Sequence, residues 1–229
     1  MCGAATFLTR DNLETVISDF RLDEARVSRD LSPNYNLRPM QNALLVRLVD
    51  GERRLEHAQW WLVPNYEPEP RTKLTTFNAR SERLLQGMFR PYFERCRALF
   101  LVDSYYEWSK EGNRRIPFRF LVDGGKHFAL AALYSLWESA DGSDRRLTCC
   151  VVTTRANELG ESVHPRMPVI LDEAAHERWL DPTNRHYREL LSLLAPFPSE
   201  RMEKYQVAPL VNSPQNNSPE CIRPVRSLL

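Results

Sequence analysis

Residues 98–109 read ALFLVDSYYEWS, an apolar run followed by an aromatic run, with the polar pair Asp103-Ser104 between them. Apolar runs of about four to eight residues, rich in Leu, Val, Phe and Tyr, are typical of buried strands. The stretch therefore predicts two consecutive strands, at 98–103 and 104–109. It also places a single carboxylate, Glu107, inside the second of them.

Strand-like segments recur on both sides of this stretch. They lie at 2–8, 43–49, 55–63, 116–122, 127–134, 147–153, 168–171 and 203–208. Helical patterns are fewer and lie at 11–20, which opens with the capping-box-like pair Asp11 and Glu14, at 81–95 with a break at Pro91, and at 172–180 and 185–194. Proline-rich connections lie at 32–39, 64–70 and 164–168. This order of elements predicts one α+β domain with a curved, largely antiparallel, barrel-like sheet and peripheral helices.

The composition is that of an ordinary globular protein. The 229 residues are 42% hydrophobic, and 31 Lys and Arg stand against 30 Asp and Glu, which excludes disorder as the dominant state. The longest apolar run, 128–134, is far shorter than the roughly 20 residues that span a bilayer, and no signal peptide opens the chain. We therefore expect a cytoplasmic protein with no membrane partner.

Glycine and cysteine usage excludes several classes of site. Only Gly124 and Gly125 lie close together among the 8 glycines, so neither the dinucleotide fingerprint nor the phosphate-binding loop can be formed. Five cysteines, an odd number, do not predict a disulfide framework. Cys149 and Cys150 are adjacent rather than at the spacing of zinc ligands. We expect no metal site and no cofactor.

Positive charge is concentrated in one segment, although the formal net charge of the chain is only +1. Within residues 71–97 the basic side chains are Arg71, Lys73, Arg80, Arg83, Arg90, Arg95 and Arg97, and the acidic ones are Glu82 and Glu94. A polyanion-binding surface and a solvated helix face would both produce this pattern. Charge alone therefore leaves nucleic-acid binding open.

Position 2 carries distinctive chemistry. Removal of Met1, which is usual before a small residue, would leave a mature chain of residues 2–229 whose Cys2 has an amine and a thiol on adjacent carbons. The amine can condense with an aldehyde to a Schiff base, and the thiolate can then close a thiazolidine ring. Two alternatives remain open: the thiol attacks an amide carbonyl with the chain's own amine as base, or Cys2 simply begins a strand.

Three further segments carry polar side chains suited to catalysis. Asn78 and Arg80 are two residues apart and share a face if the segment is extended. Glu107 is either a surface residue or a desolvated acid whose pKa is raised toward the working range. His164 lies in a proline-rich loop just before Arg166, which suits phosphate binding or proton transfer, whereas a lone histidine is more often structural.

Together these segments resemble the SRAP family, named for SOS-response-associated peptidase. The resemblance runs over nearly the whole chain and is carried by Met1-Cys2-Gly3, Tyr35-Asn36 with Pro39, Asn78-Ala79-Arg80, Tyr106-Glu107-Trp108, Val152-Thr153-Thr154, and His164 with Arg166 and Pro168. Proteins of this family are understood as suicide-like sensors of abasic sites in single-stranded DNA. The resemblance implies a single SRAP domain that shields such sites during the DNA damage response.

The resemblance also implies four catalytic residues. Cys2, freed by removal of Met1, would form the thiazolidine crosslink with the opened sugar aldehyde. Asn78 would hold the abasic sugar. Glu107 would shuttle protons during ring opening and imine formation and in a peptidase-like processing of Met1, and His164 would assist the lyase-like chemistry and its slow reversal.

Contacts with DNA are implied for a second group of residues. Its members are Arg80 and Arg166 as phosphate ligands, Pro39 and Trp108 as a wedge for bases, Asn36, and Thr153 as a pocket hydroxyl. Family members commonly carry arginine after Cys-Gly, where this chain has Ala4, so one phosphate contact is missing or is supplied elsewhere.

The partner implied is single-stranded DNA containing abasic sites, bound by a monomer that associates with the nucleoid during DNA damage. Two other functions remain as alternatives. One is an N-terminal-nucleophile amidohydrolase of the glutaminase type, and the other is a non-covalent module for binding single-stranded DNA through residues 71–97.

Overall fold

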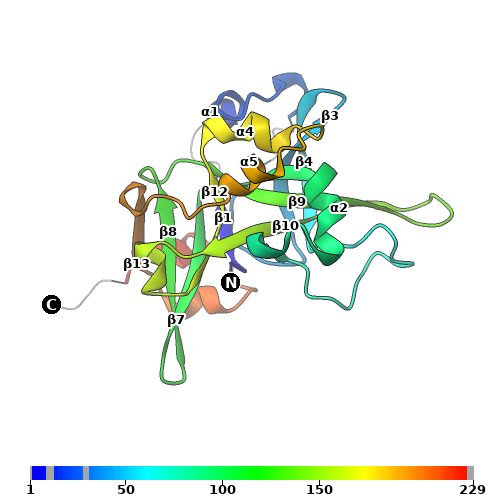
Figure 1. Cartoon of the computed structure of the whole chain (residues 1–229). Helices are drawn as coiled ribbons and strands as arrows, with labels where there is room; N and C mark the ends of the chain where they lie inside the picture. The colour runs from blue at the N-terminus through cyan, green and yellow to red at the C-terminus, as the bar shows by residue number, and fades with distance from the viewer. Residues whose placement is uncertain (1, 9–12, 28–30, 226–229) are drawn as a thin grey trace.

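The strands dominate the computed structural model, which describes residues 2–8, 13–27 and 31–225 (Figure 1). The strands are β1 (Ala5–Phe7), β2 (Asn34–Leu37), β3 (Asn42–Val49), β4 (Glu52–Trp60), β5 (Asn78–Arg80), β6 (Arg97–Val102), β7 (Ser104–Glu111), β8 (Arg114–Val122), β9 (Phe128–Glu138), β10 (Arg145–Arg155), β11 (Arg166–Pro168), β12 (Ile170–Leu171) and β13 (Met202–Gln206). The α-helices are α1 (Leu13–Asp19), α2 (Arg90–Arg95), α3 (Glu158–Glu161), α4 (Glu173–Leu180) and α5 (Tyr187–Ser192). Short 3-10 turns are η1 (Glu24–Arg26), η2 (Ser81–Arg83), η3 (Gly87–Phe89), η4 (Ser199–Arg201), η5 (Pro209–Asn212) and η6 (Pro219–Ile222).

Five strands close on themselves as a barrel. β3 pairs with β4 and β6, β6 with β9, β9 with β10, and β10 with β4, and the β10–β4 pairing is the parallel one in this ring. β5 and β11 pair with β10, and β12 pairs with β9. In Figure 1 the helices α1, α4 and α5 lie together over one side of this barrel.

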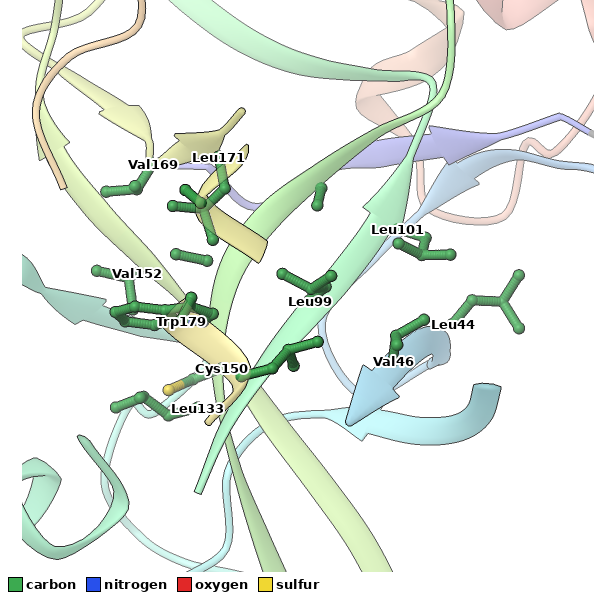
Figure 2. Close-up of a cluster of buried hydrophobic side chains, with 14 of the residues drawn as sticks. Leu44, Val46, Leu99, Leu101, Leu133, Cys150, Val152, Val169, Leu171 and Trp179 are labelled. Atoms are coloured by element: carbon green, nitrogen blue, oxygen red, sulfur yellow. The ribbon is translucent and has the colours of Figure 1, made fainter. Parts of the chain in front are cut away.

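Alternate residues of β6 face two different cores, as the period of a strand requires. Leu99 and Leu101 pack with Trp179 of α4 in one buried cluster, part of which Figure 2 shows. Phe100 packs in a second cluster that also contains Cys2. Every residue of β6 is buried, because both of its faces are covered.

A second, antiparallel sheet has the strand order β13-β8-β7-β1-β2. A buried ion pair stabilises its centre, with Arg119 Nη2 of β8 at 2.7 Å from Asp103 Oδ2, and the two side chains are 2% and 1% exposed. Asp103 Oδ1 accepts a hydrogen bond from Thr6 Oγ1 of β1 at 2.7 Å, and Arg119 Nε donates to Ser104 Oγ at 2.7 Å. The network fixes β1 against β7, and with it the residues just before β1.

The predicted α+β fold with a barrel-like sheet is confirmed, and each predicted strand corresponds to an observed one. Three details of the prediction were wrong. The proline-rich connection 32–39 contains β2, and residues 78–80 form β5, which was not expected. Pro91 does not break a helix but lies in the first turn of α2, where its missing N–H would have no partner within the helix.

The capping residue Asp11 lies outside the described residues, and α1 is described from Leu13. In the described ranges no helix is both long and apolar enough to cross a membrane.

Candidate active site

Cys2 and Asn78, which lie far apart in the sequence, are in direct contact. Asn78 Nδ2 donates a hydrogen bond to the carbonyl oxygen of Cys2 at 2.8 Å, and Cys2 is 0% exposed. Asn78 is held there because β5 pairs in parallel with β10, with Asn78 opposite Val151. Its Oδ1 is buried and has no hydrogen-bond partner among the described residues. Asn78 therefore fixes the backbone of Cys2 and retains an acceptor for a ligand.

Glu107 is the acid whose negative charge acts on the Cys2 thiol. Burial raises the pKa of the thiol far above its usual range, and the negative charge of Glu107 raises it further. Glu107 itself is only 4% exposed, and burial raises its pKa, while positive charges near it, His164 among them, oppose the shift. A carboxyl with a raised pKa holds a proton more readily than an ordinary carboxyl, which suits it to give up and take back a proton during a reaction.

His164 and Thr153 both lie beside Arg166, the first residue of β11. His164 is half-buried, and its Nδ1 lies 3.1 Å from both the amide nitrogen and the carbonyl oxygen of Arg166. Thr153 is buried, and its hydroxyl receives a hydrogen bond from Arg166 Nη2 at 3.1 Å. The pairing of β10 with β11 and β5 places Thr153 opposite both Pro168 and Arg80. Three of the predicted DNA contacts, Arg80, Thr153 and Arg166, therefore come together from three separate strands.

Tyr105 lies in the same buried cluster as Cys2, and sequence reasoning missed it. Its hydroxyl is buried without a hydrogen-bond partner in the part of the chain that the structure describes. Burial raises the pKa of Tyr105, and the charges of Cys2 and Glu107 raise it further. The spacing of Tyr105 and Glu107, two residues apart on β7, was the signal that could have found it, because alternate residues of a strand share a face.

The predicted phosphate ligands differ in their readiness to bind an anion. Arg80 is exposed, and among the described residues no ion pair engages it. Arg166 Nη1 lies 2.6 Å from Glu82 Oε1, so a phosphate must compete with this carboxylate. Arg97 is 2% exposed and donates to backbone carbonyls such as that of Trp179, so it does not contribute to a basic surface. The 71–97 segment is therefore not a uniform basic patch.

Two of the residues expected to contact DNA are largely buried, and the expectation of direct contact is corrected for them. Asn36 is 1% exposed. Its Nδ2 donates to the backbone carbonyls of Val211, Ser213 and Asn216, at 3.3, 3.0 and 2.8 Å. The ring of Trp108 is covered as well, since the residue is 8% exposed and its Nε1 donates to Asn212 Oδ1 at 2.6 Å. Both side chains anchor residues 211–216, here called the C-terminal segment, to the second sheet.

Pro39 lies in a tight turn whose exposed tip is Met40. The amide of Gln41 donates to the carbonyl oxygen of Arg38 at 3.1 Å, which closes the turn. Met40 has a φ of 77° and is 56% exposed. This left-handed backbone conformation favours glycine, and an apolar side chain held there in solvent is unusual. Met40 therefore adds exposed apolar surface beside Pro39, which the resemblance implies as part of a wedge for bases.

Replacing Met40 by glycine is expected to raise the free energy of unfolding by up to about 1 kcal/mol, because backbone strain at this position is relieved. The resemblance implies that Pro39, beside Met40, contacts single-stranded DNA, so affinity for such DNA is expected to fall when the exposed apolar side chain is lost. Chemical denaturation and fluorescence anisotropy measure the two effects. Met40→Leu is the control and should keep both properties; a glycine variant that binds DNA like the parent would separate the strain from DNA binding.

A comparison with protein-family models matches residues 1–214 to the family described as SOS response associated peptidase. The chain belongs to the SRAP family. The abasic site processing protein YoqW of Bacillus subtilis is 37% identical over 97% of this chain and 99% of its own length. The abasic site processing protein HMCES of Gallus gallus is 30% identical over 84% of this chain and 66% of its own length.

Solved structures carry the same fold as this SRAP chain. A protein of Bacteroides thetaiotaomicron superposes with a TM-score of 0.74 at 24% identity, covering 95% of this chain and 92% of that chain. A protein of Bordetella bronchiseptica superposes with a TM-score of 0.76 at 23% identity, covering 90% and 100%. At these identities the likeness concerns the fold alone.

Proposed function

We propose that this SRAP protein senses abasic sites in single-stranded DNA and shields them by forming a covalent bond through Cys2. The observation that carries the proposal is the buried contact of Cys2 with Asn78, next to an acid, Glu107, whose pKa burial raises. Relatives whose names describe abasic site processing support the choice of DNA lesion. The amide of Asn78 positions the N-terminal residue, and the carboxyl supplies protons.

Removal of Met1 is the first step that the proposal requires, because only then is the Cys2 amine free. We propose that the protein cleaves this peptide bond itself by a peptidase-like reaction, in which Glu107 activates water. The mature domain then comprises residues 2–229. Loss of a proton from the ammonium is favoured in a desolvated pocket, which leaves the amine nucleophilic.

Ring opening of the abasic sugar requires a proton on the ring oxygen and removal of a proton from the hydroxyl of the hemiacetal. The carboxyl of Glu107 can serve both in turn, giving its proton to one oxygen and taking one from the other. The unpartnered Oδ1 of Asn78 is available to accept a hydrogen bond from a sugar hydroxyl. The open form then presents its aldehyde to the amine.

Crosslinking then proceeds in two bond-forming steps. The amine adds to the aldehyde carbon, and loss of water gives the imine. The thiol sulfur next adds to the imine carbon, while its proton ends on the ring nitrogen through Glu107 or His164. Because the pKa of the thiol is raised, the thiol is protonated at rest and needs this base at the moment of closure.

We propose that Arg80 binds a DNA phosphate directly. Arg166 binds a second phosphate once that phosphate replaces Glu82 as its partner. The hydroxyl of Thr153 holds Arg166 in place by accepting a hydrogen bond from it. Pro39 and Met40 provide apolar surface beside the lesion. Contacts of this kind are sequence-independent, which fits a protein that reads a lesion and not a sequence. A single chain is sufficient for all of these contacts, and a location at the nucleoid follows from the partner.

The test is incubation of the mature protein with a single-stranded oligonucleotide that carries one abasic site. The control oligonucleotide carries the same site reduced with borohydride, so that it lacks the aldehyde. We expect a band of retarded mobility on a denaturing gel with the aldehyde and none with the reduced sugar. No band with either DNA, together with salt-dependent binding, would favour the non-covalent module; glutamine hydrolysis would favour the amidohydrolase.

A further inference from the structure

Trp108 carries two arginine side chains on its indole ring. The guanidinium carbon of Arg38 lies 5.1 Å from the ring centroid, and that of Arg115 lies 5.0 Å from it. Arg38 follows β2 and is half-buried, whereas Arg115 lies on β8 and is exposed. Two positive charges from distant segments are thereby held on one aromatic platform.

Carboxylates do not neutralise these two charges. Across residues 2–8, 13–27 and 31–225, no ion pair joins Arg38 or Arg115 to an acid, in contrast to the pairing of Arg166 with Glu82. Burial lowers the pKa of Arg38, and the positive charge of Arg115 lowers it further. Two like charges at one ring repel each other, so the arrangement is more favourable with an anion bound between them.

Two parts of the platform, Arg38 and the indole of Trp108, are held in place by hydrogen bonds. Arg38 Nε donates to Asn36 Oδ1 at 2.8 Å, and its Nη2 donates to the carbonyl of Val211. The indole is fixed by the bond from Trp108 Nε1 to Asn212 Oδ1 at 2.6 Å. Arg38 is thus oriented by residues of the same buried network that anchors the C-terminal segment. Its side chain therefore loses little conformational freedom when a ligand binds.

The position of the platform relates it to the candidate active site. Trp108 follows Glu107 directly on β7 and lies on the opposite face of that strand. Ala4 is buried in the same cluster as Trp108, so position 4 offers no charge of its own here. Arg38 also begins the turn that carries Pro39 and Met40 at its tip.

We propose that Arg38 and Arg115, stacked on Trp108, form a phosphate site for the backbone of the bound single-stranded DNA, on the face of β7 opposite Glu107. The ligand follows from the chemistry: Arg115 offers the parallel N–H donors of its guanidinium to phosphate oxygens, and Arg38 offers the donors that its bonds to Asn36 and Val211 leave. The identity of the nucleic acid rests on the function proposed above.

Equilibrium binding of a labelled oligonucleotide with a borohydride-reduced abasic site tests the proposal, because this DNA cannot crosslink. We expect the R38Q/R115Q double variant to bind about fourfold more weakly per lost contact at about 0.15 M salt. The slope of log K against log salt should fall by about 0.7 for each contact.

Arg114→Gln is the matched control, since Arg114 is the exposed neighbour of Arg115 on β8 and contributes the same charge. Its affinity and salt slope should remain those of the parent. Should R38Q disturb folding, Arg115→Gln alone suffices, because Arg115 is exposed on the surface.

An unchanged salt slope in R115Q and in the double variant overturns this inference, even when the parent forms its adduct. Failure of the parent to form an adduct overturns the proposed function instead, and the salt slope still reports on the phosphate site.

Discussion

A Cys2→Ala protein without Met1 is expected to form no adduct with abasic DNA that survives heating in denaturant. Alanine keeps the free amine, so an imine can still form, but no sulfur is present to close the ring and the imine hydrolyses. The yield of persistent adduct should fall by at least about 100-fold, as for loss of a covalent nucleophile. Denaturing electrophoresis after heating measures it, and borohydride trapping should recover the transient imine.

Cys96→Ala is the matched control for this experiment, because it removes a thiol that is half-buried on the barrel and has no part in the proposed chemistry. Its yield should equal that of the parent. Persistent adduct in the Cys2→Ala protein would show that another residue makes the lasting bond.

Glu107→Gln, prepared without Met1, is expected to slow adduct formation by about 100-fold or more at neutral pH, because the amide neither gives nor takes a proton during ring opening. The affinity for reduced abasic DNA should change little, so the loss lies in the rate. A time course at saturating DNA measures the rate. Glu111→Gln, an exposed change on the same strand, is the control; equal rates in the two variants would remove Glu107 from the mechanism.

The same substitution has an opposite effect on stability. The pKa of Glu107 is raised in the folded state by burial, so the folded protein holds this proton more tightly than the unfolded chain. The free energy of unfolding therefore falls as the pH rises from the ordinary carboxyl pKa through the raised one. Glutamine removes this loss. Chemical denaturation should find E107Q more stable than the parent at neutral pH and no more stable in acid.

Part of the fold was predictable because some of its strands, β6 above all, are buried on both faces. Long apolar runs such as 98–102 keep their signal without any knowledge of partners, and β6 is buried throughout. β2 and β5 were missed because they are short and polar, and their pairing with β1 and β10 decides their conformation. Local propensity is overridden by such pairing.

The candidate site was predictable in its residues more than in its electrostatics. Family resemblance named Cys2, Asn78 and Glu107, and the structure brings the first two into contact. The burial of Trp108 and Asn36 was not predictable, since nothing in the sequence around them indicates that the C-terminal segment covers both side chains. The arginine pair on Trp108 depends on that covering, and no spacing in the sequence relates positions 38 and 115.

The central claim is that the Cys2 amine and thiol both bond to the abasic sugar. The intact mass of the purified adduct tests it most directly, with peptide mapping of the linked residue. The expected mass is that of the chain without Met1 plus that of the DNA, minus one molecule of water. Peptide mapping should find the DNA on the N-terminal peptide. An adduct that retains Met1, or that maps to a lysine, would contradict it.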